Sequence, residues 1–542
     1  MSGHAANPPD FDALIIGAGF SGIAMLHLLR EARLSARVFE VAPAVGGTWY
    51  WNTYPGARTD SESWYYCFSF SKALLEKWKW SERYPSQPEM RRYFDFALDE
   101  LGLRPHIQCS TEVESAQWED AARLWSVRTT DGKTTTARYL VSAMGLLNEP
   151  LYPSVPGMDR FEGGCYHTGR WPQEGVELGG KRVGILGAGA SAVQFLPHAA
   201  EQAAQVTLFQ RTPNYVFPAR NRAITENQQR ELQANYDAMW ERIRGNLFAM
   251  PFEGSPANRL AAQTPPKERE RIYSELWKTG GFRFFFESFD DLLVDEQANR
   301  TAADFMRRQI GDVVKDPATA AMLMPRDYPL FAKRPPSGQG YFEAFNQPNV
   351  RLVDVKRDPV VAIEPWGLRT RSGAEHRFDV LVLATGFRAF TGSFERTPVR
   401  GRDGVSLIDH WKRHGVRTWL GCAVLGFPNF FMLGGPQIPF GNAPTIVEHV
   451  AELAVACMLA ARRRGADLVE IDPQAEREWN ELVDQVMAST LVRHGEEVGS
   501  WFTGANVEGQ KTSNMVYVGG ANDYFRRCRE TAAGGFREFA FR

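Results

Sequence analysis

The chain has 542 residues, more than one hydrophobic core usually serves, so about two to four domains are expected. A formal net charge of −2 argues against a nucleic-acid partner. No apolar run reaches the roughly 20 residues that span a bilayer, so no membrane partner is expected. The six cysteines include no Cys-x-x-Cys pair, which argues against a disulfide framework, a metal site or a redox dithiol and favours a cytoplasmic protein.

The first motif is a glycine-rich turn that follows an apolar strand, Ala13–Ile16. A helix is expected after it, over residues 23–30, and a second strand leads to Glu40. Its carboxylate would accept hydrogen bonds from a ribose hydroxyl, which a plain glycine-rich turn would not explain. The turn therefore predicts a dinucleotide site. Gly17 would permit the tight turn, Gly19 would let the backbone approach a pyrophosphate, and Gly22 would let the helix pack on the strand.

A carboxylate in this place repels a 2′-phosphate, so the first site suits FAD or NAD rather than NADP. Two segments rich in glycine and aromatic residues follow directly, 46–49 and 54–60, and could wrap the flavin end of FAD. We therefore expect FAD here, with further contacts from Gly47, Thr48, Trp49 and Asp60. The aromatic side chains of 49–94 and 274–289 are expected mainly to fill the core, although they could also line a pocket.

A second strand and glycine-rich turn begin at Arg182, with Ala192 in place of the third glycine. The following strand, 205–209, ends without an acid, and Arg211 stands where a guanidinium can bind a 2′-phosphate. We therefore expect NADPH rather than NADH, unless Arg211 is only a solvated surface residue. The contacts predicted for this site are Gly187, Gly189, Ser191, Arg211 and Thr212.

Two further apolar segments, Tyr139–Gly145 and Phe378–Phe387, are typical of buried parallel strands that end beside a dinucleotide. The turn of the second contains Ala384, Thr385 and Gly386. The whole pattern predicts an α/β fold of two interleaved Rossmann-like domains with a helical insertion packed on the NADP-binding part. The expected bounds are 1–150 and 387–542 for FAD binding, 151–223 and 326–386 for NADP binding, and 224–325 for the insertion, with helices over 226–243 and 295–313.

Between the two sites lies FEGGCYHTGRWP, residues 161–172. It resembles the F-x-G-x-x-x-H-x-x-x-W-P/D fingerprint of the flavin-dependent Baeyer–Villiger monooxygenases, of the cyclohexanone and phenylacetone monooxygenase type. The resemblance spans about residues 12–525 and is carried by Phe161, Gly163, His167, Trp171 and Pro172, by Gly47, Trp49, Tyr54, Pro55, Gly56 and Asp60, and by segments 384–386 and 501–506.

The resemblance implies that NADPH reduces FAD and that O₂ then gives a C4a-peroxyflavin. This species attacks a ketone, and the Criegee-type adduct rearranges to an ester or lactone. Two alternatives stay open: an N- or S-oxygenating flavin monooxygenase, and a flavoprotein redox sensor without oxygenation. A monomer or weak oligomer is expected.

The resemblance also assigns roles to single residues. Arg334, in the pair Lys333-Arg334, corresponds to the catalytic cation, and Asp60 to the acid that pairs with it. Without the resemblance, the former would pass for part of a surface pair and the latter for a turn residue. Lys333 would join Arg211 on the 2′-phosphate, Trp501 would line the nicotinamide site, and the fingerprint histidine would be structural.

Residues 490–515 form a candidate lid that becomes ordered when NADP⁺ binds. Arg388 and the stretch 337–340 depart from the family pattern, and the sequence alone leaves the effect of both open.

Overall fold

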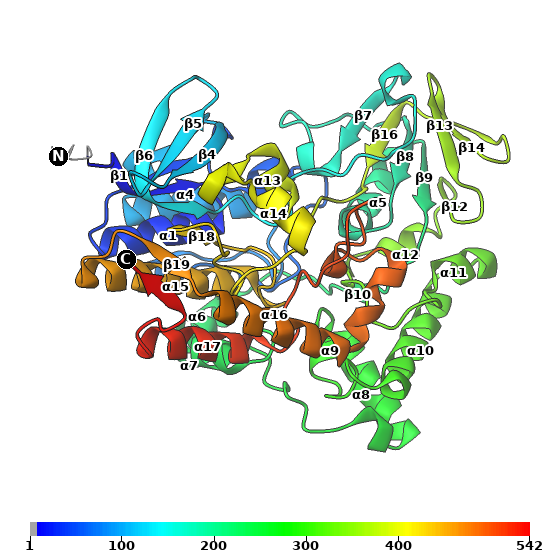
Figure 1. The fold of residues 1–542 in the computed structure, drawn as a ribbon. Helices are drawn as coiled ribbons and strands as arrows, with labels where there is room; N and C mark the ends of the chain where they lie inside the picture. Colours follow the sequence, from blue (N-terminus) through cyan, green and yellow to red (C-terminus); the bar gives the residue numbers. More distant parts are fainter. Residues whose placement is uncertain (1–7) are drawn as a thin grey trace, which may run out of the picture.

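The computed structural model describes residues 8–542 and contains two large β-sheets side by side (Figure 1). The first has the strand order β17-β4-β5-β6-β1-β2-β3, and β18 pairs with β6. Strand β1 lies between β2 and β6 and runs parallel to both. The strands are β1 (Phe11–Ile16), β2 (Ala36–Phe39), β3 (Ile107–Gln108), β4 (Val113–Glu119), β5 (Leu124–Thr129), β6 (Thr134–Ser142), β17 (Val399–Arg400) and β18 (Phe430–Met432).

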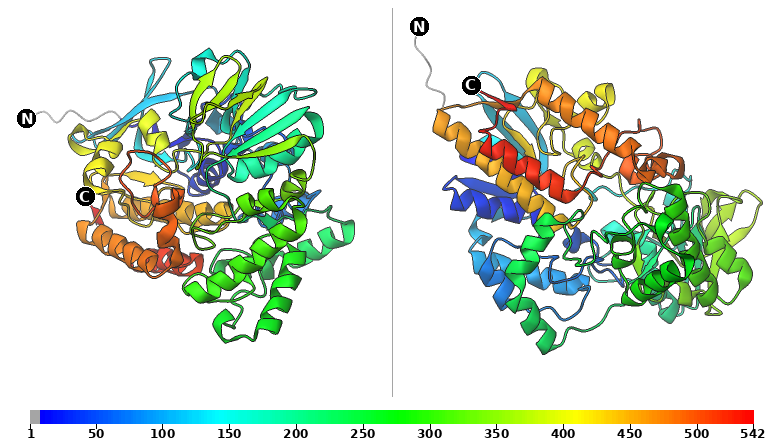
Figure 2. Two further views of the ribbon diagram at one scale, coloured as in Figure 1. Left: turned by 90° about the vertical axis from the view of Figure 1, so that its right-hand side faces the viewer. Right: turned by 90° about the horizontal axis from the view of Figure 1, so that it is seen from below.

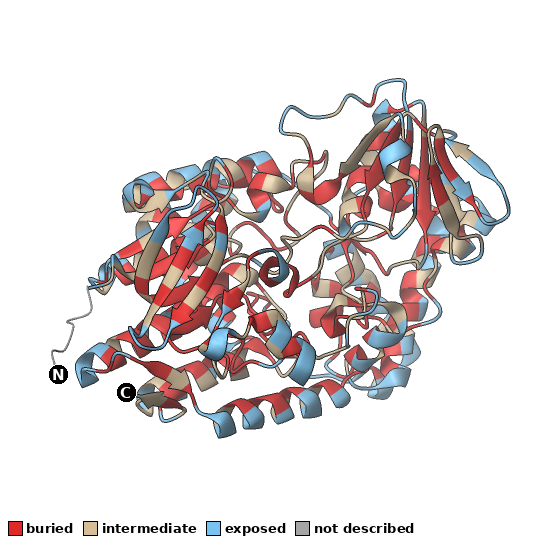
Figure 3. Ribbon diagram, turned by 45° about the horizontal axis from the view of Figure 1, so that its top comes forward, coloured by how far each residue is buried: buried red, intermediate tan, exposed pale blue. Residues whose placement is uncertain are grey.

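The second sheet is wholly parallel, in the order β12-β9-β8-β16-β7. Its inner strands are buried, as expected for a parallel sheet covered on both faces (Figure 3). The strands are β7 (Gly164–His167), β8 (Arg182–Leu186), β9 (Gln205–Gln210), β12 (Val350–Asp354) and β16 (Val380–Leu383). The two expected crossover strands are therefore β6 and β16, and the prediction of two Rossmann-type halves is confirmed.

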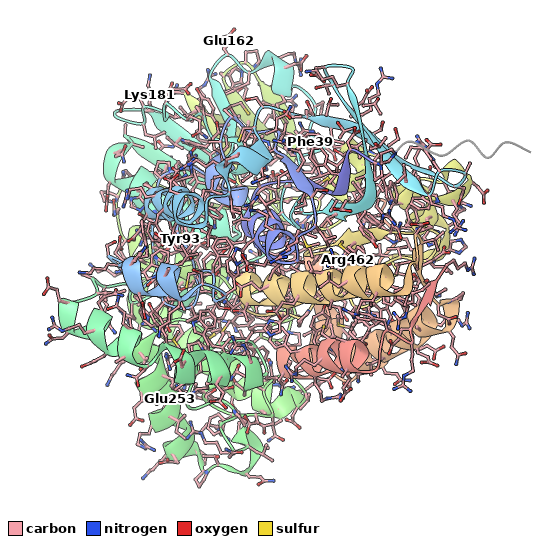
Figure 4. The ribbon with its side chains drawn as sticks, turned by 90° about the vertical axis from the view of Figure 1, so that its left-hand side faces the viewer. Phe39, Tyr93, Glu162, Lys181, Glu253 and Arg462 are labelled. Carbon is pink, nitrogen blue, oxygen red and sulfur yellow. The ribbon has the colours of Figure 1, made fainter. Side chains whose placement is uncertain are left out.

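Helices cover the first sheet in successive layers. Helix α1 (Phe20–Glu31) packs against α15 (Ala443–Arg464), and α15 packs against α17 (Ala521–Ala533), as Figure 4 shows below the labelled Phe39. Against expectation, α15 is long and apolar enough to cross a membrane by length and composition. However, 78% of its apolar stretch is buried inside the molecule, which is the usual environment of a core helix.

The insertion contains α6 (Glu226–Ala234), α7 (Tyr236–Gly245), α8 (Pro266–Thr279), α9 (Arg283–Phe286), α10 (Glu296–Val313) and α11 (Pro317–Leu323). The helix expected over 226–243 is divided at Asn235. Helix α7 packs against α17, and α10 contacts α12 (Tyr341–Ala344). The insertion thus contacts both halves of the molecule and not only the NADP-binding part, as Figures 1 and 2 show.

A small antiparallel sheet, β13-β14-β15, was not predicted. The remaining strands and α-helices are β13 (Val360–Glu364), β14 (Gly367–Thr370), β15 (Glu375–Arg377), β10 (Phe217–Pro218), β11 (Ser337–Gly338), β19 (Val469–Ile471), β20 (Phe539–Phe541), α2 (Thr48–Trp51), α3 (Lys72–Lys77), α4 (Gln87–Leu101), α5 (Ala190–Gln202), α13 (Gly392–Arg396), α14 (Leu407–His414) and α16 (Pro473–Ala488). The residue bounds expected for the domains stay a prediction.

Candidate active site

One cavity of about 1040 Å³ extends from the glycine-rich turn after β1 to the turn after β8. Of the residues predicted to bind a cofactor or to act in catalysis, all except Gly22 line this cavity. They are Gly17, Gly19, Glu40, Gly47, Thr48, Trp49, Asp60, Gly187, Gly189, Ser191, Arg211, Thr212, Lys333, Arg334, Ala384, Thr385, Gly386 and Trp501. Residues more than 400 positions apart in the sequence are therefore brought to one space.

The two glycine-rich turns share one geometry. Gly17 has a φ of +105°, and a Cβ there would lie 2.5 Å from the carbonyl oxygen of Ala143, which follows β6. Gly187 has a φ of +103°, and its Cβ would lie 2.4 Å from the carbonyl oxygen of Ala384, which follows β16. Both the positive φ and the close carbonyl require glycine, so each turn is formed against the end of its crossover strand.

Each turn leads into a helix whose first amide groups have no side-chain partner among residues 8–542. Helix α1 begins after Gly19 and α5 after Gly189, and neither N-cap residue supplies a hydrogen bond from its side chain. Free N–H groups and the helix dipole suit a pyrophosphate. Gly22 has another task, because a Cβ there would lie 1.9 Å from the Gly17 carbonyl oxygen. The site therefore fits a dinucleotide at both ends.

Glu40 directly follows β2 and is 4% exposed. Its Oε2 accepts a hydrogen bond from the amide of Ala18 at 2.6 Å, and its Oε1 accepts one from the amide of Ala42 at 2.8 Å. Burial raises the pKa of Glu40 above its ordinary value, although both amide contacts oppose the shift. The two amides fix the carboxyl group at the cavity wall. Its remaining lone pairs can accept hydrogen bonds from ribose hydroxyls.

Arg211 and Lys333 give the other end of the cavity a positive charge. Burial lowers the pKa of Lys333 to about 8, and the neighbouring charge of Arg211 adds to the shift. Within residues 8–542, neither cation has a carboxylate within 4.0 Å. Two adjacent cations without an acid form a site for a dianion, as the 2′-phosphate of NADPH requires.

Arg334 and Asp60 form an ion pair on the cavity wall, with 2.7 Å between Nη1 and Oδ2. The guanidinium also lies over the rings of Phe282 and Phe440, with its Cζ 5.3 Å and 5.9 Å from their centroids. Burial alone would lower the pKa of Arg334, but the charge and hydrogen bond of Asp60 outweigh it and the pKa rises above its usual value. The cation is therefore permanent and is 24% exposed.

His167 of the fingerprint is buried and does not line the cavity. Its Nδ1 accepts a hydrogen bond from the amide of Gly169 at 3.0 Å, so Nε2 carries the proton and donates to the carbonyl of Gly386 at 3.1 Å. Burial lowers the pKa of His167 to about 4. The geometry favours the structural reading, because a neutral imidazole ties the fingerprint to the turn after β16.

The sequence prediction missed Gln194 as a cavity residue, and it assigned no role to Asn506 of segment 501–506. The Oε1 of Gln194 accepts a hydrogen bond from the Tyr54 hydroxyl at 2.8 Å, and its Nε2 donates to the Arg58 carbonyl at 3.0 Å. Its spacing of three from Ser191, on the same face of α5, could have indicated it. Asn506 donates to the Phe387 carbonyl at 2.8 Å and so connects the candidate lid to the turn after β16.

The departures from the family pattern have structural explanations. Arg388 forms a partly exposed ion pair with Glu395 at 3.3 Å, away from the cavity lining. Ser337 and Gly338 form β11, which pairs with β10. The aromatic side chains of segments 49–94 and 274–289 mainly fill the core, and those that line the cavity are Trp49, Trp51, Tyr54 and Tyr66.

The profile of the family described as pyridine nucleotide-disulphide oxidoreductase matches residues 14–246. Disulfide chemistry does not follow for this chain, because its six cysteines are all free and include no Cys-x-x-Cys. The Baeyer-Villiger monooxygenase of Pseudooceanicola batsensis is 41% identical over 95% of this chain and 93% of that protein. The phenazine N-monooxygenase PhzNO1 of Lysobacter antibioticus is 40% identical over 98% and 96%.

Solved structures agree. Cyclohexanone monooxygenase from Rhodococcus sp. Phi1, bound to NADP⁺, is 39% identical and covers 99% of this chain and 100% of its own, with a TM-score of 0.95. The OTEMO complex with FAD and NADP is 36% identical over 99% and 100%, with a TM-score of 0.94. The resemblance seen in the fingerprint is confirmed, and the chain belongs to the flavin-dependent Baeyer–Villiger monooxygenase family.

Proposed function

We propose that the protein converts a ketone into an ester or lactone, with Arg334 and Asp60 as its catalytic pair. The reaction class is that of the family: NADPH supplies two electrons, one atom of O₂ enters the product, and the other leaves as water. The observation that carries the proposal is the 2.7 Å ion pair on the wall of the cavity that also contains both glycine-rich turns.

The two cofactors of the family, FAD and NADPH, fit opposite ends of the cavity. The first turn and Glu40 suit the FAD pyrophosphate and ribose, and the second turn, with Arg211 and Lys333, suits NADPH. When bound, the flavin supplies the redox chemistry and the site of O₂ activation. We assign the segments beside it, 46–49 and 384–386, to holding the cofactors in register, and Trp501 to the nicotinamide wall.

Arg334 contributes a charge that needs no proton. A guanidinium stays protonated at any pH at which the protein is folded, so it stabilises negative charge on oxygen without acting as an acid. Its contact with Asp60 and its place over Phe282 and Phe440 set the direction of its free N–H groups. A preorganised cation of this kind supplies electrostatic stabilisation, which is usually the largest single contribution to catalysis.

N-oxygenation is the second candidate, because the phenazine N-monooxygenase is as similar to this chain as the Baeyer-Villiger relative. The test is product analysis with NADPH over cyclic ketones, aromatic N-heterocycles and a sulfide. Ester or lactone as the main product supports the proposal, and N-oxide without ester refutes it.

We also propose a cytoplasmic protein that is a monomer or weak oligomer. The cysteines are free, and the large exposed apolar side chains among residues 8–542 are few: Tyr152, Leu247, Leu260 and Val294. Size-exclusion chromatography with light scattering would test the oligomeric state, and a stable tetramer would contradict it.

A further inference from the structure

A buried cluster of four charged side chains begins two residues after Asp60 and has no part in the site described above. Oε1 of Glu62 accepts a hydrogen bond from Nε of Arg83 at 2.8 Å, and Nη2 of Arg83 lies 2.6 Å from the same oxygen. The other oxygen of Glu62 lies 3.6 Å from Arg283, and Arg283 also pairs with Glu287 at 2.9 Å. The side chains of Glu62, Arg83 and Glu287 are 2%, 5% and 9% exposed, and that of Arg283 is 22% exposed, so the cluster is buried except at Arg283.

The cluster joins three segments that are distant in sequence: 59–63, 81–86 and 279–287. The Arg83 side chain donates a hydrogen bond to the carbonyl of Thr279 at 2.6 Å. The backbone carbonyl of Arg83 accepts a hydrogen bond from the amide of Ser63 at 2.7 Å. Gly281 has a φ of +69°, and a Cβ there would lie 2.1 Å from the Tyr84 hydroxyl. The insertion therefore approaches segment 81–86 more closely than a side chain at 281 would allow.

Two neighbours of the cluster residues in the chain contact Arg334. Asp60, in the same loop as Glu62, has its Oδ2 2.7 Å from the guanidinium. Phe282, the residue before Arg283, has its ring under the same guanidinium, 5.3 Å from Cζ to the ring centroid. The ion cluster thus ties together the backbones that carry two of the contacts of Arg334. A displacement of about 1 Å at a reacting group can cost a hundredfold in rate, so such support has functional weight.

We propose that Arg283 is a positioning residue for the oxygenation reaction, which holds Asp60 and Phe282 in place around Arg334 through its contact with Glu62. The inference rests on the role proposed above for Arg334. If Arg334 is displaced, NADPH and O₂ are still consumed, but the two electrons reduce O₂ to hydrogen peroxide, with one proton from NADPH and one from water, and no oxygen enters the ketone. The ratio of ester formed to NADPH consumed reports on this positioning.

The test compares Arg283→Met with Arg271→Met in the FAD-loaded protein. Arg271 is the matched control, because it lies in the same insertion and its ion pairs with Glu268 and Glu275 are exposed. We expect Arg283→Met to lower the ester-to-NADPH ratio at least about threefold, with the KM for NADPH nearly unchanged. The control should keep the parent ratio, and Arg283→Lys, which retains the charge, should restore a large part of it.

Hydrogen exchange provides a readout that is independent of turnover. Amides of 59–66 should exchange faster in Arg283→Met than in the parent or in Arg271→Met, because the anchor of that loop is lost. If exchange rises while the product ratio stays at the parent value, Arg283 has only a structural role and the proposal is wrong. If Arg271→Met lowers the ester-to-NADPH ratio as much as Arg283→Met does, the proposal is also wrong.

Arg283→Met breaks a buried ion pair, which can prevent folding. If that variant does not fold, Glu287→Gln is tested in its place. This variant loosens Arg283 while the Glu62–Arg83 contact stays intact. It should lower the same ratio in the same direction, and an unchanged ratio overturns the proposal. If Arg334→Ala itself keeps full ester formation, the proposed function fails first. If Arg334→Ala abolishes ester while Arg283→Met and Glu287→Gln keep the parent ratio, only the present inference fails.

Discussion

Replacement of Arg334 by alanine removes the single permanent charge proposed to act on the reacting oxygen. A unit charge about 4 Å away at an effective dielectric near 20 contributes about 4 kcal/mol, which corresponds to roughly a thousandfold in rate. Asp60, at 2.7 Å, compensates part of this charge, and the guanidinium is 24% exposed. We therefore expect the effective contribution to be nearer 3 kcal/mol, and ester formation to fall about a hundredfold or more.

The assay measures ester by gas chromatography and, in the same samples, NADPH consumption and hydrogen peroxide. NADPH should still be oxidised by Arg334→Ala, because Arg211 and Lys333 are unchanged, while peroxide replaces ester. Arg388→Ala is the control, since Arg388 forms a partly exposed ion pair with Glu395 outside the cavity lining. Ester formation within about threefold of the parent would refute the electrostatic argument, because the missing charge could then contribute less than about 1 kcal/mol.

Removing Arg334 also leaves Asp60 without its cation, so one substitution changes two things. The double variant Arg334→Ala/Asp60→Asn removes both charges together. If the lost cation is the cause, the double variant should remain as inactive as the single one. Recovery of ester formation in the double variant would show instead that the unpaired carboxylate was inhibitory.

Four further outcomes are expected. Arg211→Ala should raise the KM for NADPH far more than that for NADH, and equal increases would remove the phosphate-binding role. The pKa of Lys333 is about 8, so its positive charge is present below that pH and is lost above it. The affinity for NADP⁺, measured by titration, should therefore fall above pH 8, and in Lys333→Met this fall with pH should be absent. Gly22→Ala places a methyl 1.9 Å from the Gly17 carbonyl oxygen and should reduce FAD retention, measured by flavin absorbance. Segment 490–515 should resist protease better with NADP⁺ than without it, and identical digestion would argue against a lid.

The parts of the fold with strong local signals could be predicted from the sequence. The strand, turn and helix around Gly17 and Gly187 follow from apolar runs and glycine spacing, because both signals act within about 30 residues. The sheet β13-β14-β15 was missed, since its short strands carry no marked alternation of apolar residues. The helix expected over 226–243 is divided at Asn235, a position where the periodicity continues but the helix ends.

The candidate site divides in the same way. Glu40 and Arg211 could be proposed as cofactor contacts from the sequence, because each directly follows a strand that comes after a recognisable glycine-rich turn. Arg334 and Asp60 needed the family resemblance, since nothing local distinguishes them from a surface pair and a turn residue. The contact between Glu62 and Arg283 joins residues more than 200 positions apart, and only the folded chain brings them to 3.6 Å.

The buried imidazole of the fingerprint, His167, has a consequence for acid–base behaviour. Because the pKa of His167 lies near 4, the ring has the same protonation state throughout the range in which cells and enzyme assays operate. Its bond to Gly386 is therefore insensitive to pH in that range, so the link between the fingerprint and the turn after β16 has no ionisation step. Any inflection of turnover between pH 6 and 9 belongs to another group, and Lys333 is the first to examine.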